Sequence, residues 1–546
     1  MKLLRDYRKN VLKKGLAALL GAGMMFISYG VTPAASEKGK WLTGDFHQYT
    51  TYSDGSYSYG LMMEKSNHYG LDWWAQSGHG GGFTRWGKYG IDTGGDVFFD
   101  LLTPNPIMGD VKLSGSHQIM WRWQSLRDWA FLDCLEAREM YPEKVIVQGV
   151  EWNVPGHEHC SVSNINEQFN ETNPNCNVLA EFDYKFDKND ADASGGAAQG
   201  WKKSELSNLH PKSVEAVTWL QENYPRTSYA IMAHPERQGP WVDNKTSTGY
   251  NIEHFRDMNN AAPDVCFGFE SIPGHQADPE RGGYSPSKAF GGTYGGAGFY
   301  SAKIGGLWDA LLGEGRRWWL FANSDCHLHY SHGGDDFWPG EYQKTYTFVQ
   351  DSNGDSIYSA QEIVDGLRSG NSFCVNGDLI SELEFTARKG ADIVTMGDEL
   401  SIPRGNNNPI IIKIKFKSPS LNNNGDVPVV DHIDLIEGEI TGKVSPSDPN
   451  YTKAVNETTK VIATFTAADW KVKDGYNVIV YKVRVDKSKY YRLRGTNLPP
   501  NTPYETDAEG NPLADYLATN YLGLDGAQEA WADLWFYSNP IFVYVK

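Results

Sequence analysis

The chain has little cysteine, a shortage of basic residues and no long apolar segment after its N-terminal region. Six Cys in 546 residues are too few for a disulfide scaffold, and no Cys-x-x-Cys pair is present to hold zinc through thiolates. Lys and Arg number 50 against 68 Asp and Glu, and the net charge of −18 argues against a nucleic-acid backbone as the main partner. Cys160 and Cys326, which lie beside candidate ligands, are expected to be small buried packing residues, with a disulfide left open.

The first 36 residues read as an export signal rather than as part of a fold. A basic segment precedes an apolar stretch from Gly15 to Tyr29, and the small residues of Thr32–Ser36 suit cleavage by signal peptidase. An uncleaved N-terminal anchor is the alternative. No later segment approaches the ~20 apolar residues of a membrane span. We expect residues 1–36 to be a signal peptide, no span after it, and a mature chain exported to the periplasm or secreted.

Hydrophobic residues make up 40% of the chain and aromatic residues 13%, which is enough for two or three packed domains. From residue 41 to 383, short apolar runs alternate with helical spacing. The expected strands are 145–150, 229–233, 265–269 and 318–322, and the expected helices are 119–141, 211–224 and 359–369. This alternation predicts βα units and a mostly parallel sheet, open or closed into a barrel.

The pattern changes after about Ser381. Short apolar or alternating runs are separated by Asn-, Gly- and Pro-rich turns, which predicts an all-β, sandwich-like domain over residues 384–546. Its aromatic residues could stack on a glycan or bind a surface partner, although filling a core explains them as well. These candidates are Trp470, Trp531, Trp535 and Tyr537.

Histidine and acidic residues recur directly after the predicted strands. They are His47, Asp54, His79, Glu151, His159, His234, Asp325 and His327. Ligands of such sheets bind at the carboxyl ends of the strands, so we expect these side chains to meet. Imidazole with carboxylate suits Zn, Mn or Fe, and the set exceeds the ligands of one open zinc site. The sequence therefore predicts two or three divalent metal ions, with Glu151 able to bridge two of them.

Some of these assignments leave an alternative open. His159 is preferred to His157 because the Cys-Ser-Val after it fits re-entry into a strand, and otherwise His157 takes the role. Asp54 lies in Ser-Asp-Gly, which is also an ordinary turn sequence. The remaining histidines are expected in exposed loops or in surface and capping positions: His68, His117, His210, His254, His329 and His332.

The ordered segments resemble the metal-binding motifs of the PHP family, the polymerase and histidinol phosphatase domains. The resemblance covers residues 41–383 and implies a distorted (β/α)7 barrel with a di- or trinuclear metal site that hydrolyses phosphate mono- or diesters. Two positions depart from the family. Tyr49 replaces the second His of His-x-His, and Gly78 replaces the Asp before His79. Tyr49 either binds metal through its phenolate or donates a hydrogen bond, which favours two ions over three.

Groups beyond the metal ligands would have to handle an anionic substrate. Arg237 follows His234 by three residues and could bind a phosphate oxygen with its guanidinium. His275 follows a predicted strand and could act as a proton donor, and Tyr49 is the other candidate for a catalytic role. An ordinary salt bridge or loop position explains Arg237 and His275 equally well.

The sequence thus predicts an exported phosphoesterase that uses a metal-bound hydroxide on a small phosphorylated substrate. A metal-dependent hydrolase of another bond, such as an amide or lactone, is the second reading, because metal-bound hydroxide serves those bonds too. A non-catalytic surface- or glycan-binding protein on the same scaffold is the third.

Overall fold

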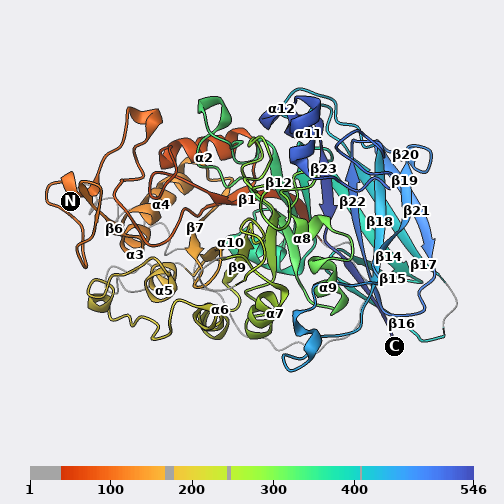
Figure 1. The fold of residues 1–546 in the computed structure, drawn as a ribbon, viewed down its shortest axis with the longest axis horizontal. Coiled ribbons are helices and arrows are strands. Elements are labelled where there is room, and N and C mark those ends of the chain that lie inside the picture. The colour runs from red at the N-terminus through yellow and green to blue at the C-terminus, as the bar shows by residue number, and fades with distance from the viewer. Residues whose placement is uncertain (1–37, 167–176, 243–247, 406–408) are drawn as a thin grey trace. The chain divides into compact units, whose positions relative to one another are not determined.

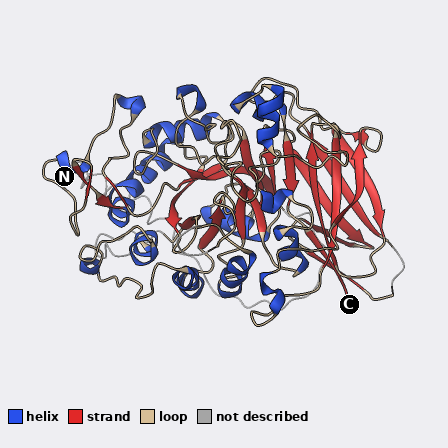
Figure 2. Ribbon diagram, in the orientation of Figure 1, coloured by secondary structure: helices blue, strands red, loops and turns tan. Residues whose placement is uncertain are grey.

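The computed structural model describes residues 38–546 apart from 167–176, 243–247 and 406–408. The expected signal peptide lies outside these residues. Lys38–Lys546 form one compact unit of mixed α/β structure, with a large sheet and a separate antiparallel sheet (Figures 1 and 2). No helix in this part of the chain has the length and apolarity to cross a bilayer.

The large sheet has 15 strands within the described residues. Thirteen follow one another in the order β11 (Trp319–Ala322), β10 (Gly268–Ile272), β9 (Ser228–Ala233), β8 (His159–Asn164), β7 (Val145–Asn153), β2 (Trp73–Gln76), β1 (Gly39–Gln48), β12 (Gln343–Gln350), β13 (Ser372–Asn376), β23 (Trp535–Ser538), β22 (Lys489–Thr496), β18 (His432–Glu439) and β19 (Lys460–Thr466). β24 (Ile541–Val545) also pairs with β22, and β16 (Glu399–Ile402) pairs with β24.

The strands of this sheet that come first in the sequence are mostly parallel to one another. β1, β2 and β7 run parallel, as do β9, β10 and β11, whereas β8 is antiparallel to both of its neighbours. A bridge joins Gln48 of β1 to Cys326, just after β11, and the N–H of Asp325 donates to the carbonyl oxygen of His47. The carboxyl ends of β1 and β11 therefore meet, although no ladder joins these two strands along their length in the described residues.

Helices lie between the strands, as the alternating pattern predicts. They are α2 (Tyr59–His68), α3 (Arg122–Ser125), α4 (Phe131–Met140), α5 (Val178–Phe186), α6 (His210–Asn223), α7 (Ile252–Ala261), α8 (Phe299–Ala302), α9 (Leu307–Gly313), α10 (Ala360–Ser369), α11 (Asp515–Leu522) and α12 (Gly526–Ala532). The expected helix 119–141 instead begins as a short strand and contains a π-helical turn over 126–130. The strand expected from 265 starts at Gly268.

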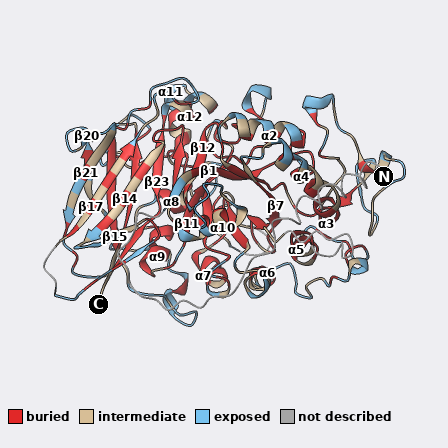
Figure 3. Cartoon of the chain, turned by 180° about the vertical axis from the view of Figure 1, so that it is seen from behind, coloured by how far each residue is buried: buried red, intermediate tan, exposed pale blue. Residues whose placement is uncertain are grey.

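Five strands form the separate antiparallel sheet, in the order β15 (Asp392–Thr395), β14 (Glu382–Lys389), β17 (Ile410–Lys417), β21 (Tyr476–Val483) and β20 (Lys471–Lys473). Alternate residues of β17 are buried, as in a strand with one face on a core. Ile412 and Ile414 share that core with Ile433 and Leu493 of the large sheet. The two sheets therefore pack face to face as a sandwich. Its strands lie at one end of the molecule in Figure 2, and Figure 3 shows that many of their residues are buried.

One layer of the sandwich belongs to the large sheet. β13 pairs with β23, so strands from residues 384–546 extend the sheet begun by β1 and β2. Trp535 and Tyr537, two candidates for stacking on a glycan, are buried in one hydrophobic core, and Trp470 and Trp531 pack against another. These four rings are accounted for by core packing.

Candidate metal centre

The eight candidate ligands lie together at the ends of strands of the large sheet. They fall into overlapping groups whose ligand atoms lie within 4.8 Å of one another. The groups are His47 with His234 and Asp325, Asp54 with His79 and His327, and His79 with Glu151 and His159. β1, β2, β7, β8, β9 and β11 each contribute at least one of these residues or end just before one. The parallel sheet therefore gathers side chains up to 280 residues apart, His47 and His327 being the extremes.

Glu151 lies at the centre of this group and is fully buried. Its Oε1 is 3.0 Å from His159 Nδ1, 3.0 Å from His234 Nε2 and 3.3 Å from His47 Nε2. Its Oε2 is 2.7 Å from His79 Nδ1. One carboxylate thus contacts four imidazoles from four parts of the chain, which is the position of a carboxylate that bridges two cations.

Asp325 is the second buried carboxylate of the group. Its Oδ1 is 3.2 Å from His47 Nε2, and its Oδ2 accepts from Arg237 Nη2 at 3.0 Å. His275 Nε2 is 3.3 Å from the same Oδ2. Arg237 and His275, predicted to meet the substrate, are therefore brought to the edge of the ligand group through Asp325.

Tyr49 lies among the ligand rings. Its hydroxyl is 3.4 Å from both His47 Nε2 and His79 Nδ1, and its ring stacks on His327 with centroids 3.5 Å apart. His327 Nδ1 is 2.8 Å from the carbonyl oxygen of Asp325, so Nδ1 carries the hydrogen and Nε2 keeps a lone pair. Asp54 Oδ2 is 3.9 Å from that Nε2 and 3.5 Å from His79 Nε2.

Three residues of the group have a left-handed backbone. The φ angles are 32° at His234, 54° at His275 and 50° at Asp325. Residues with a Cβ rarely adopt this conformation, and it clusters at functional sites where the surrounding structure enforces it. Here it turns the chain sharply after β9 and β11, and it accompanies the placing of these three side chains at the group.

The buried polar atoms of the group fit a bound cation. Glu151 Oε2, Asp325 Oδ1, His159 Nδ1 and His234 Nδ1 are buried without a hydrogen bond of acceptable geometry among the described residues. Buried polar groups normally find a partner, and a bound ion is one of the few explanations for several unpaired atoms in one place. Imidazole and carboxylate are the donors that zinc, manganese and iron accept, so the residues present suit such ions.

Protonation differs from ring to ring in this group. Burial lowers the pKa of His47 and of His159, but the surrounding carboxylates raise both more, so these two rings would release a proton when an ion binds. Burial raises the pKa of Glu151, but His159 and His47 lower it more, so this pKa lies well below its usual range. Burial, and then His159 and His327, hold the pKa of His79 well below its usual range. Burial, and then Arg237, lower the pKa of His234. Glu151 is therefore an anion at neutral pH, while His79 and His234 are neutral and keep a lone pair, as metal binding requires.

Three carboxylates at the centre were not singled out as site residues by the sequence. Glu270 Oε2 is 2.7 Å from His47 Nδ1 and orients that ring. Asp336 is 2.5 Å from His275 Nδ1 and also accepts the N–H of His327. Glu158 Oε2 is 3.6 Å from His234 Nδ1. The position of Glu270 at a strand end and of Glu158 beside His159 were usable signals, whereas Asp336 lies in a loop without one.

The structure separates His159 from His157. His159 contacts Glu151, whereas His157 Nε2 is 2.8 Å from His210 Nδ1 in a different group.

Two other positions discussed from the sequence have a local explanation. The absence of a side chain at Gly78 has a steric reason, because a Cβ there would overlap Ser53 Oγ. His329 was expected in an exposed loop, but it is buried because its ring stacks on Trp338. Its Nε2 lies 2.9 Å from Glu341 Oε2.

The turn before α10 carries a further acidic pattern. Asp351, Asn353 and Asp355 alternate along it, and Glu362 follows with the spacing of an EF-hand loop. Here Glu362 accepts the N–H of Ser359 and completes the capping box of α10. Asp351 accepts the N–H groups of the turn, so this pattern is accounted for by helix entry.

No protein-family model matches the chain, and no curated protein matches it. A solved structure from Bacteroides vulgatus, described as a two-domain protein containing a predicted PHP-like metal-dependent phosphoesterase, is 12% identical in sequence. The match covers 89% of this chain and 98% of the other, with a TM-score of 0.31. At this score the likeness supports no conclusion about this chain.

Proposed function

We propose that the chain is a metal-dependent phosphoesterase whose active site is the group around Glu151. The contact of this one buried carboxylate with four imidazoles carries the proposal. Paired ions at such a group are the usual device for displacement at phosphorus. The ordered motifs that resemble the PHP family support phosphate as the reacting centre. On the same ground we propose that β1, β2 and β7–β11 form the distorted (β/α)7 barrel of that family.

Two ions account for the residues present. One would be held by His47, His234 and Asp325, and the other by His79 and His159, with Glu151 shared between them. His327 and Asp54 lie on the side of His79 and would complete the second ion's ligands or hold a third. When bound, divalent ions supply Lewis acidity toward phosphoryl oxygens and lower the pKa of water toward neutrality.

Three side chains would act on the substrate. Arg237 is held by Asp325 through one nitrogen, and its Nε has no partner among the described residues, which leaves N–H groups for a phosphoryl oxygen. Burial lowers the pKa of His275, but Asp336 and Asp325 raise it more, to about 10. His275 therefore holds a proton at neutral pH that it can donate toward a leaving oxygen. The Tyr49 hydroxyl faces the inward nitrogens of His47 and His79 and would lie beside the ions, where it can bind metal through its phenolate or donate a hydrogen bond to the substrate.

The test is hydrolysis by the purified mature chain after removal of metal and reloading with manganese or zinc. We expect turnover of an aryl phosphate monoester or diester, and its loss together with bound metal in His234→Ala. His329→Ala is the matched control, because His329 is also buried against a carboxylate but lies outside the group. Absence of turnover on both esters, with unchanged metal content in His234→Ala, would overturn the proposal.

Two further measurements define the proposal. Hydrolysis of a lactone or amide panel in place of phosphate esters would reassign the bond while keeping the metal centre. The first 36 residues lead us to propose export to the periplasm or medium after cleavage of a signal peptide. The proposed substrate is a small phosphorylated compound. Mass analysis of the N-terminus after cell fractionation tests that cleavage.

A further inference from the structure

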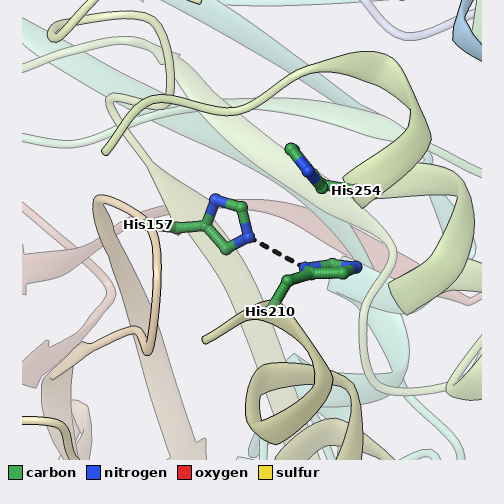
Figure 4. Close-up of side chains that lie close together, drawn as sticks. All are labelled: His157, His210 and His254. Carbon is green, nitrogen blue, oxygen red and sulfur yellow. Dashed lines mark hydrogen bonds between the residues drawn. The ribbon is translucent and has the colours of Figure 1, made fainter. Parts of the chain in front are cut away.

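A second group of histidines shares no residue with the metal centre. His157 lies in the turn between β7 and β8, His210 is the first residue of α6, and His254 is in the first turn of α7. Their rings converge in Figure 4, and one ligand atom from each lies within 4.8 Å of the others. The ring centroids are 4.4 to 4.9 Å apart.

The outer hydrogen bonds of two rings fix the positions of their protons. His157 Nδ1 is 3.1 Å from the carbonyl oxygen of Gly249, and His210 Nε2 is 3.1 Å from Asp257 Oδ2. A carbonyl or carboxylate oxygen only accepts, so each of these nitrogens carries hydrogen. In a neutral imidazole the other nitrogen then has a lone pair. Those two nitrogens, His157 Nε2 and His210 Nδ1, face each other at 2.8 Å (Figure 4).

Two lone pairs at this distance repel each other unless a cation lies between or beside them. The outer partners, a backbone carbonyl and a carboxylate, are those that orient metal-binding histidines in proteins. We propose that His157, His210 and His254 bind a divalent transition-metal ion of the class that prefers imidazole, such as zinc. His157 Nε2 and His210 Nδ1 are the two ligand atoms already aimed at the ion.

His254 is the third ligand. Its Nδ1 accepts the N–H of Asn251 at the start of α7, and this is the hydrogen bond that ion binding replaces. Aromatic rings enclose the group: Tyr250 stacks on His157 with centroids 4.5 Å apart, and Trp241 packs edge-on against His254 at 5.3 Å. These rings shield two of the three ligands, and an ion held by three histidines would keep its fourth position for water.

The bound ion would tie together three elements, of which the β7–β8 turn leads into the metal centre. It joins the β7–β8 turn, which carries Glu158 and His159, to the N-termini of α6 and α7. Asp257 extends the connection, because its Oδ1 accepts from the Tyr451 hydroxyl at 2.6 Å. The expected role is to hold the turn that presents His159 to Glu151.

Crystals of the full chain soaked in zinc, with anomalous scattering measured at the zinc edge, test the proposal directly. We expect a peak about 2.0–2.1 Å from both His157 Nε2 and His210 Nδ1. The same map reports the Glu151 centre separately, so the two sites succeed or fail independently. No peak between these rings in zinc-saturated crystals overturns the proposal, and a proton shared by His157 and His210 then accounts for their short contact.

Solution measurements give a second readout. His210→Gln and His254→Ala should each lose one zinc equivalent per chain and lower the Tm in zinc more than in a chelator. His117→Gln is the matched control: His117 lies 3.0 Å from Asp100, and its side chain is 23% exposed against 19% for His210. Unchanged zinc content in both test variants contradicts the proposal. If a variant does not fold, the zinc map of the unaltered chain still decides.

Discussion

Two regions of the molecule bury charged side chains, and they neutralise them differently. In the sandwich region, Asp309 pairs with Arg492 through two hydrogen bonds of 2.8 Å, and Asp434 accepts hydrogen bonds from Arg494 and Thr464. At the metal centre, Glu151 faces four imidazoles. Guanidinium groups complete the first arrangement, whereas among the described residues only imidazole rings face the carboxylate in the second. A buried carboxylate that no guanidinium or ammonium group of these residues neutralises, such as Glu151, therefore points to a missing ion.

The largest effect is expected where the protein supplies its own cation. Asp309→Asn leaves the Arg492 guanidinium buried without an anion, and should lower the free energy of unfolding by about 3–5 kcal/mol. Urea unfolding at fixed metal concentration measures it. Asp486→Asn is the control, since this exposed carboxylate lies 3.9 Å from Lys489 and should change stability by less than ~1 kcal/mol. Equal losses in both variants would remove the contrast between the regions.

The next effect is expected at Glu151. Glu151→Gln should reduce metal affinity and hydrolysis by at least about 100-fold, because even the outer partners of metal ligands contribute 10–100-fold. In the presence of a chelator, it should lower the free energy of unfolding less than Asp309→Asn does, because no protein cation depends on Glu151 alone. Metal titration and chelator-treated unfolding separate the two quantities. If Glu151→Gln lowered the free energy of unfolding strongly but changed metal affinity little, Glu151 would be a structural carboxylate.

A smaller effect is expected from Glu270, which orients His47 from behind. Glu270→Gln should weaken metal binding by roughly 10–100-fold while leaving the ligand set complete. Metal titration followed by activity at saturating metal distinguishes orientation from ligand loss. Glu341→Gln is the control, because Glu341 holds the buried ring of His329 at 2.9 Å outside the centre. The same weakening in both variants would indicate a general loss of packing.

The smallest effect concerns carboxylates that protons rather than cations neutralise. Glu529 lies with Asp515 and Asp533 around Arg281; burial, and then Asp515, raise its pKa to about 9. The folded chain therefore keeps a proton that the unfolded chain loses near pH 4.5, so stability falls as pH rises from about 4.5 to about 9. The Tm of Glu529→Gln should fall less over this range. Parallel Tm curves would mean that Glu529 is ionised in the fold.

Much of the centre could be predicted because its residues follow buried strands. The apolar runs before Glu151, His234 and Asp325 identify strands, and the carboxyl ends of neighbouring strands meet whatever their separation in sequence. The strand-end position of Glu270 was a usable signal, but the ring that it contacts depends on side-chain directions that periodicity does not encode, and Asp336 lies in a loop. The grouping of His157 with His210 also joins a turn to a helix N-terminus without any shared pattern.

The organisation of the sheets was less predictable. A run of alternating apolar residues identifies β17 or β22 as a strand but does not specify which strand it pairs with. The antiparallel direction of β8 depends on the short turn after β7, which the apolar pattern of the two strands does not reveal. The sharing of one sheet by early and late segments of the chain was hidden for the same reason.

The pairing of β13 with β23 has a consequence for the expression of truncated forms of the chain. A fragment ending near residue 383 would leave the backbone N–H and C=O groups of Cys374 and the C=O of Ser372 without the chain that now bonds them. Exposed strand edges of this kind recruit other chains, so such a fragment would tend to aggregate. The half of the chain that carries the candidate metal centre is thus expected to be recovered in soluble form only when the late strands are translated with it.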